Sequence, residues 1–126
     1  MKTKVYTDKA PKVVGPYSQA VIDENLIFVS GQIPINPLDG KLVEGTIEEQ
    51  AQQVMNNLKN VLNSAGVDFS DVVKTTIYTI DMSFYPKINE VYASFLTEPF
   101  PARETVGVKE LPAGARIEIS MIAVKK

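Results

Sequence analysis

The segment TIEEQAQQVMNNLKNVLNSAG, residues 46–66, decides the fold. Thr46, with Glu49 three residues later, forms the capping-box pattern that marks a helix N-terminus. Behind it, apolar residues recur at spacings of three and four, which places them on one stripe of a helix. These residues are Ile47, Ala51, Val54, Leu58, Val61, Leu62 and Ala65. Because Gly66 is a natural stop, the pattern predicts a helix over residues 47–65 with one buried face.

A second, shorter helix is predicted after Ser83. Pro86 is tolerated in the first turn of a helix, and Pro99 and Pro101 end the segment. Its predicted buried face consists of Tyr85, Ile88, Val91, Tyr92, Phe95 and Leu96. Between the two helices, VVKTTIYTI (72–80) is rich in β-branched and aromatic residues and predicts a strand.

Further strands are expected near residues 3–7, 17–22, 26–31, 103–108 and 116–124. The order β-β-β-α-β-α-β-β predicts a single α+β domain over residues 1–126, in which two helices cover one face of a mixed sheet. The other face must then be polar or covered by a partner chain. The segment LIFVS (26–30) carries apolar residues on both sides and so indicates a partner.

Composition limits the possible chemistry. The chain has 126 residues, 44% of them hydrophobic, and contains neither cysteine nor histidine. This excludes disulfides, Ser-His-Asp triads, Cys-His dyads and histidine metal sites, so we expect no metal and no cofactor. A net charge of −2 makes nucleic acid a poor candidate partner. Without an apolar segment of signal or membrane-spanning length, a soluble cytoplasmic protein is expected.

The last two predicted strands carry the most informative polar residues. In RIEISMIAV (116–124) the alternation turns the apolar residues toward the helices and Glu118 away from them. In PARETVGV (101–108) the same reasoning takes Val106 and Val108 as helix-facing and leaves Arg103 on the helix-free face. If KELPAGA (109–115) closes an antiparallel hairpin, Arg103 and Glu118 lie about 5–8 Å apart. They could then converge on one small ligand, or form only a cross-strand ion pair at a subunit interface.

Three other segments hold weaker candidates. In GPYSQA (15–20) the Tyr17 ring could close a pocket, or be an ordinary core aromatic beside a turn. In VSGQIP (29–34) the lack of a side chain at Gly31 would let a ligand approach the backbone. Asn89 is the one polar candidate in the second helix, where a solvated side chain is the alternative interpretation.

From end to end the sequence resembles the RidA family, also called YjgF or L-PSP. The matching segments are APKVVGPYSQA, IFVSGQIPINPLDGKLV, IEEQAQQVMNNLKNVLNSAG, VVKTTIYTIDM, INEVYASF, FPARETVGVKELP and RIEISMIAV. The resemblance implies a chorismate-mutase-like fold and a homotrimer with three clefts between subunits. It also implies a 2-iminobutanoate/2-iminopropanoate deaminase, which hydrolyses the 2-aminoacrylate or 2-aminocrotonate released by pyridoxal-phosphate enzymes to a 2-keto acid and ammonia.

The resemblance also implies roles for single residues. The carboxylate-binding arginine of the family falls on Arg103, its acidic residue on Glu118, and its pocket tyrosine on Tyr17. The ligand-binding SGQ segment of the family falls on Ser30 and Gly31, and its helix asparagine falls on Asn89. The family's binding residue two positions after the arginine falls on Thr105. Many members carry cysteine at this last position. Glu104 is expected to place a carboxylate beside the arginine and to bias the choice of substrate.

Two rival functions remain open at this level. A regulatory protein could hold a keto acid in the same cleft without turnover. An endoribonuclease is the other rival, and it is disfavoured by the absent histidine, the acidic pI of about 5.1 and the lack of a basic-aromatic segment.

Overall fold

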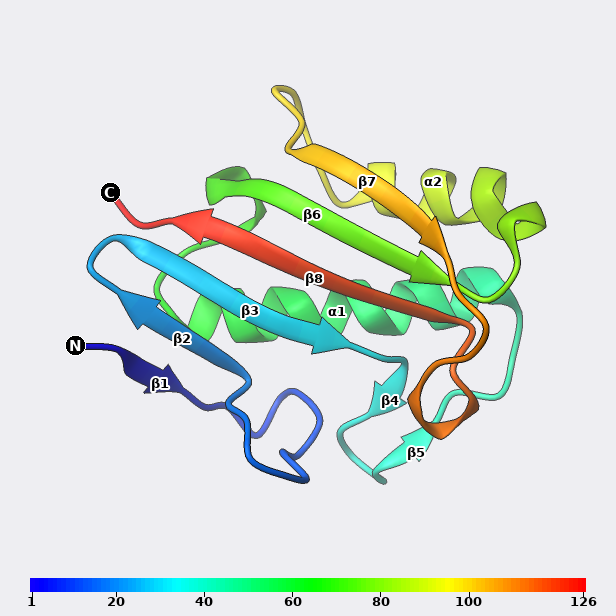
Figure 1. The fold of residues 1–126 in the computed structure, drawn as a ribbon, viewed down its shortest axis with the longest axis horizontal. Coiled ribbons are helices and arrows are strands. Elements are labelled where there is room, and N and C mark those ends of the chain that lie inside the picture. The colour runs from blue at the N-terminus through cyan, green and yellow to red at the C-terminus, as the bar shows by residue number, and fades with distance from the viewer.

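A six-stranded sheet with two α-helices on one face forms the centre of the molecule (Figure 1). The structure is a computed structural model and describes residues 1–126. Along the sheet the strands are β1 (Thr3–Val5), β2 (Ala20–Asp23), β3 (Leu26–Gln32), β8 (Ile117–Val124), β6 (Val72–Thr79) and β7 (Ala102–Gly107). Neighbours are antiparallel except β6 and β7, which are parallel. The predicted α+β class is therefore confirmed.

Both predicted helices are present. Helix α1 (Ile47–Ser64) has the expected capping box, in which the Glu49 N–H donates to Thr46 Oγ1 (3.1 Å) and the Thr46 N–H donates to Glu49 Oε1 (2.9 Å). It ends one residue before the predicted limit, with Ala65 as the cap and Gly66 at a positive φ of 85°. A short 3₁₀ turn (Met82–Phe84) leads into α2 (Tyr85–Ser94). No helix has the length and apolar character needed to cross a membrane.

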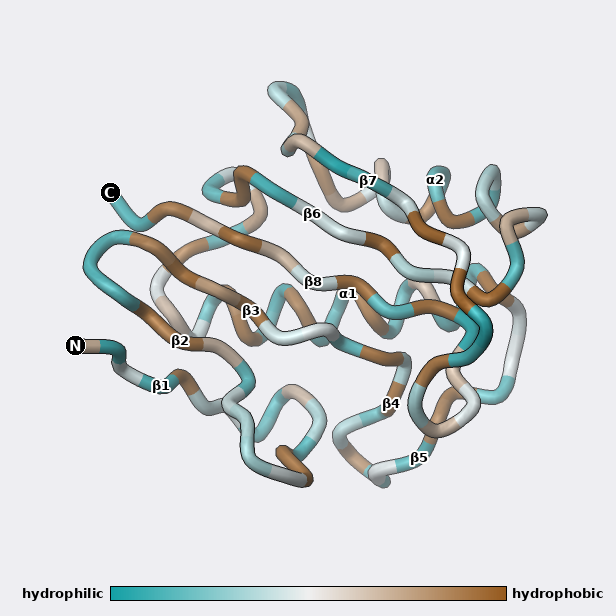
Figure 2. The backbone as a smooth tube through the Cα atoms, in the orientation of Figure 1, coloured by the Kyte–Doolittle hydropathy of each residue, from teal (hydrophilic) through white to brown (hydrophobic).

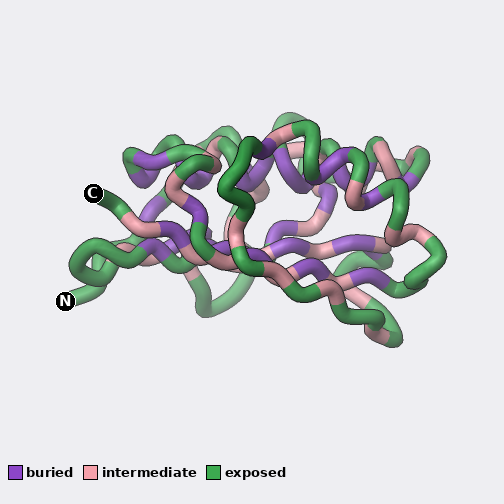
Figure 3. Tube along the Cα trace, turned by 90° about the horizontal axis from the view of Figure 1, so that it is seen from above, coloured by how far each residue is buried: buried purple, intermediate pink, exposed green.

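The core lies between the helices and the sheet. Along β6 and β8 buried residues alternate with partly exposed ones, and the buried set of β8 is the predicted one (Ile117, Ile119, Met121 and Ala123). Figure 3 shows the alternation as bands along the strands, with the helices on one side only. We call the face away from the helices the open face. It also carries exposed apolar residues, among them Leu26 and Phe28 of β3. Figure 2 shows much of β3 in the brown of hydrophobic residues.

Some strand boundaries differ from the predicted ones. Strand β2 begins at Ala20 rather than 17, because residues 6–19 form a loop. A small separate sheet of β4 (Ile35–Asn36) and β5 (Lys41–Leu42) was not predicted. Strands of two residues are too short for an alternating pattern, so no periodicity could reveal them.

The predicted hairpin between the last two strands is wrong. Strand β7 pairs in parallel with β6, and β8 pairs with the opposite edge of β6. The helix between β6 and β7 explains this arrangement, because parallel neighbours need a long crossover and α2 supplies it. Residues 108–116 then carry the chain past the end of β6 to β8, with a 3₁₀ turn at Pro112–Gly114.

Candidate active site

Strand β7 faces the opposite way from the prediction. The Arg103 side chain lies toward α2, where it contacts Tyr85 and Tyr92, whereas Glu104 lies on the open face. The prediction took apolar residues as helix-facing, but Val106 is exposed at the edge of the open face. Apolar alternation marks whichever face becomes buried, and on an edge strand of a sheet with two apolar faces it does not identify that face.

Arg103 and Glu118 of one chain therefore lie far apart. Glu118 pairs with Tyr78 on β6, and Tyr78 pairs with Val106, three residues along β7 from Arg103. Two strand spacings across and three residues along give a Cα separation of about 14 Å. The two side chains also point to opposite faces of the sheet. A single chain cannot bring this guanidinium and this carboxylate onto one small ligand.

Arg103 is the centre of a group on the α2 side that we call the arginine cluster (Arg103, Tyr85, Tyr92, Asn89 and Thr105). Its guanidinium carbon lies 5.5 Å from the ring centre of Tyr85 and 5.2 Å from that of Tyr92, within cation–π range. Arg103 Nη2 donates a hydrogen bond to Tyr85 Oη at 2.8 Å. No carboxylate pairs with Arg103, so its positive charge remains available to an anion.

A hollow of about 330 Å³ opens beside the guanidinium and is lined by Asn89, Tyr92, Ala93, Phe100, Pro101 and Arg103. One observation supports the predicted binding roles of Asn89 and Thr105. Asn89 Oδ1 and Thr105 Oγ1 are the buried side-chain atoms in the molecule that have no hydrogen-bond partner. Native proteins satisfy nearly all such atoms, so two of them in the cluster of an unpaired arginine indicate a site for a polar ligand.

Glu118 belongs to a second group, the glutamate cluster, which consists of Glu118, Gly31 and Ser30, with Tyr17 on the loop that Ser30 holds. The Glu118 carboxyl lies directly over Gly31, where an added Cβ would come within 2.7 Å of its Cδ. The sequence predicted that a ligand would approach the backbone at Gly31, whereas in the structure the Glu118 side chain occupies the space beside this glycine. Burial without a cationic neighbour raises the pKa of the Glu118 carboxyl above its ordinary value. A carboxylate of raised pKa is a stronger proton acceptor.

The loop that carries Tyr17 is tied to the same end of β3. Ser30 Oγ donates to the Ser18 carbonyl at 2.5 Å, and the Ser30 N–H donates to the Gln19 carbonyl at 2.9 Å. The Tyr17 side chain remains exposed, so it is not the core aromatic of the alternative interpretation. Ser30 fixes the loop by these contacts, and its neighbour Gly31 lies under Glu118.

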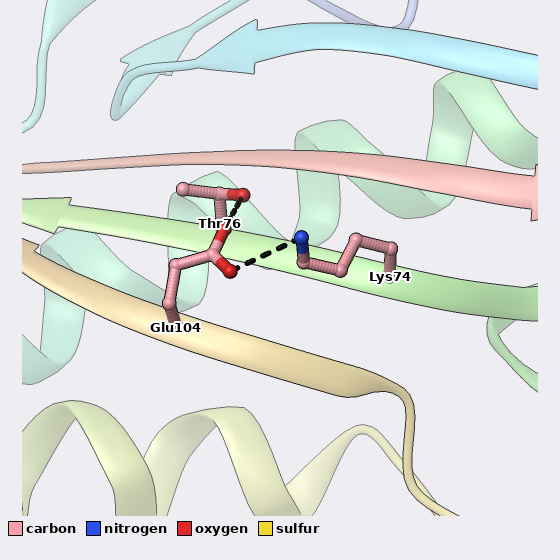
Figure 4. A network of polar contacts seen from close by, with 3 residues as sticks. All are labelled: Lys74, Thr76 and Glu104. Atoms are coloured by element: carbon pink, nitrogen blue, oxygen red, sulfur yellow. Dashed lines mark hydrogen bonds and ion pairs between the residues drawn. The ribbon is translucent and has the colours of Figure 1, made fainter.

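Glu104 does not lie beside the arginine, contrary to the prediction. It accepts a hydrogen bond from the Thr76 hydroxyl and pairs with Lys74 Nζ at 3.1 Å on the open face (Figure 4). The hydrogen bond from Thr76, and to a lesser extent the contact with Lys74, holds the pKa of Glu104 below its ordinary value. Since successive residues of a strand point to opposite faces, Glu104 has no path to the ligand side of Arg103 in its own chain.

Tyr85 and Tyr92 were predicted only as buried helix residues, and their contacts with Arg103 were missed. They are seven residues apart, two helical turns, so both lie on the α2 face toward β7. Tyr92 Oη donates to the buried Thr75 Oγ1 at 3.0 Å, and burial raises the pKa of Tyr92. Two tyrosines seven residues apart, on one face of the predicted helix, were the available signal.

Comparison with known proteins shows that the chain is similar to members of one family. A sequence profile described as Endoribonuclease L-PSP matches residues 7–125. A RutC family protein of Pyrococcus horikoshii is 47% identical over 126 residues, with full coverage of both chains. The human protein named 2-iminobutanoate/2-iminopropanoate deaminase is 43% identical over 121 residues, 96% of this chain and 88% of its own.

Solved structures agree with the sequence matches. A Thermotoga maritima protein described as a candidate endoribonuclease has a TM-score of 0.98 at 52% identity, covering 100% of this chain and 99% of its own. The Escherichia coli protein TdcF, solved with bound serine, has a TM-score of 0.94 at 35% identity, covering 98% and 99%. The sequence matches and the structural matches therefore both extend over the full length of the chain. The chain belongs to the RidA (YjgF, L-PSP) family.

Proposed function

We propose that the protein is an imine deaminase that hydrolyses 2-iminobutanoate and 2-iminopropanoate to 2-keto acids and ammonia. The observation that carries the proposal is Arg103, which has no ionic partner, beside a hollow lined by Asn89, whose Oδ1 atom has no hydrogen-bond partner. Three mammalian relatives at 42–44% identity bear the name of this activity, which supports the assignment. A structural relative with bound serine supports a ligand of amino-acid size.

The substrate's carboxylate binds Arg103 in this proposal. A planar guanidinium offers two parallel N–H donors to a carboxylate, which fixes the orientation of the ligand as well as its position. Asn89 and Thr105 supply further polar contacts to the same ligand. Tyr17 closes the pocket over it, and Ser30 and Gly31 bring backbone near the reacting atoms.

Glu118 transfers the protons in the proposed reaction. The imine carbon is already electrophilic, so water can add to it without a covalent nucleophile. As the C–O bond forms, Glu118 takes one proton from the attacking water and delivers it to the imine nitrogen, which gives a carbinolamine. Glu118 then takes the proton of the carbinolamine hydroxyl and delivers it to the amino group as the C–N bond breaks. Ammonia leaves and the carbonyl of the 2-keto acid remains.

The complete site requires two chains, because Arg103 and Glu118 of one chain face opposite sides of the sheet. We propose a homotrimer in which the arginine cluster of one subunit meets the glutamate cluster of the next. The apolar residues of the open face, Leu26 and Phe28 among them, support association through that face. Three such junctions give three clefts.

A coupled assay tests the proposed activity. Threonine dehydratase releases 2-aminocrotonate from threonine, and we expect the protein to accelerate the formation of ammonia and 2-oxobutanoate. Arg103→Ala removes two charge-assisted hydrogen bonds to the substrate and should lower kcat/KM by about 100-fold or more. The control Lys87→Ala removes an exposed cation from α2 and should retain full acceleration.

Acceleration by Arg103→Ala equal to that of the unaltered protein would contradict the proposal. Ligand binding without any acceleration by the unaltered protein would instead favour a regulatory role. RNA cleavage that copurifies with the protein and survives Arg103→Ala would favour the endoribonuclease that the family description names.

A further inference from the structure

Arg103 is held by aromatic side chains rather than by a carboxylate. It projects from an edge strand, where a long side chain ordinarily samples many rotamers. Here its guanidinium lies within 5.5 Å of two tyrosine ring centres, and one nitrogen donates to Tyr85 Oη. Lys74 and Glu104 form the one ion pair of the molecule, and it lies on the other face of the sheet.

The two tyrosines hold Arg103 in different ways. Tyr92 is buried, and its hydroxyl is engaged with Thr75, so it offers Arg103 only the face of its ring. Tyr85 is half-buried, and Arg103 is the hydrogen-bond partner of its hydroxyl. The Tyr85 hydroxyl is therefore the polar group that fixes the rotation of the guanidinium about its own axis.

A neutral acceptor suits this task. A carboxylate in the place of Tyr85 Oη would also orient Arg103, but it would neutralise the charge and compete with an anionic ligand. A phenolic oxygen accepts one N–H and leaves the net positive charge for the ligand. The hollow lined by Asn89 and Arg103 does not include Tyr85, so this hydroxyl acts on a ligand there through the guanidinium.

We infer that Tyr85 is a positioning residue that orients the Arg103 guanidinium for a carboxylate ligand and thereby sets the affinity of the site for 2-keto and 2-imino acids. The inference rests on the proposed role of Arg103 as carboxylate anchor. It assigns the specificity for the carboxylate group to a pair of residues, Tyr85 and Arg103, rather than to the arginine alone.

Tyr85→Phe tests the inference, since it keeps the ring and removes the hydroxyl. Titration calorimetry with 2-oxobutanoate should give a Kd raised about tenfold, the cost of one hydrogen bond at a charged group. In the dehydratase-coupled assay KM should rise by a similar factor while kcat stays within about twofold. Ser94→Ala removes a hydroxyl hydrogen bond to Val91 from the same helix and should change neither quantity.

A double-mutant cycle separates positioning from a merely structural role. Lysine lacks the second nitrogen that reaches Tyr85, so in an Arg103→Lys background Tyr85→Phe should change the Kd by less than about twofold. A tenfold loss in that background as well would show that Tyr85 acts independently of Arg103 and would overturn the inference.

The remaining outcomes are also decisive. If Tyr85→Phe leaves the Kd unchanged while Arg103→Ala abolishes binding, the inference fails and the proposed anchor stands. If Arg103→Ala itself binds 2-oxobutanoate normally, the anchor and the inference fall together.

Discussion

At the scale of single residues, the site depends on charged groups left without an ionic partner. Arg103 is oriented by neutral tyrosines, and Glu118 lies against the Cα of Gly31 with no cation beside it. Each is costly to keep in a half-buried place, because burial disfavours the charged form unless something stabilises it. Residues that bear such a cost without a structural partner are candidates for function.

Glu118→Gln should change the pH dependence of both stability and activity. The folded-state pKa of Glu118 is raised, so the folded chain binds the proton more tightly, and stability falls as pH rises from the ordinary carboxyl range through the raised value. The variant should therefore gain about 1–3 °C in Tm at pH 8 and nothing near pH 4. Its hydrolytic activity should be lost at every pH.

Thermal unfolding from pH 4 to pH 8 measures the first effect, and the coupled assay measures the second. In the unaltered protein, activity should fall on acidification through the raised pKa as Glu118 becomes protonated. A variant less stable than the unaltered protein at pH 8 would show that a cation in the assembly, such as Arg103 of the neighbouring subunit, outweighs the cost of burying the Glu118 charge.

At the scale of secondary-structure elements, local sequence patterns predicted which helices and strands exist better than which strands pair. Both helices and all six strands of the main sheet were foreseen, because each has a periodicity or a cap of its own. The pairing of β7 with β6 was not foreseen, since it is decided by the α2 crossover rather than by the residues of β7. The facing of Arg103 failed with it, although the facing of Glu118 on the buried strand β8 was correct.

The loop of residues 6–19 depends on one buried side chain. Gln19 accepts from the Thr7 N–H at 2.8 Å and donates to the Thr7 and Pro11 carbonyls at 3.0 Å. Gln19→Leu would leave these backbone groups unpaired and should lower the free energy of unfolding by about 2–4 kcal/mol. Urea unfolding measures it, with Gln52→Leu on the exposed side of α1 as the control. Equal stability of the two variants would refute the anchoring role.

At the scale of the whole molecule, the two clusters lie on opposite faces of one sheet, and the open face is uncovered in the single chain (Figure 3). The family resemblance proposed which residues form the site, because side-chain identity can be compared in the sequence alone. Their division between two surfaces could not be foreseen, because it follows from strand order. An active site built from these clusters belongs to a junction between chains.

Mixing two inactive variants tests this most directly. Arg103→Ala retains the glutamate cluster, and Glu118→Gln retains the arginine cluster, so a junction between them can hold one intact pair. After subunit exchange at equal amounts, a cyclic assembly with random neighbours contains intact sites at about one junction in four. We expect recovery of about a quarter of the unaltered activity in the dehydratase-coupled assay. A mixture as inactive as its two components would contradict a site shared between two chains.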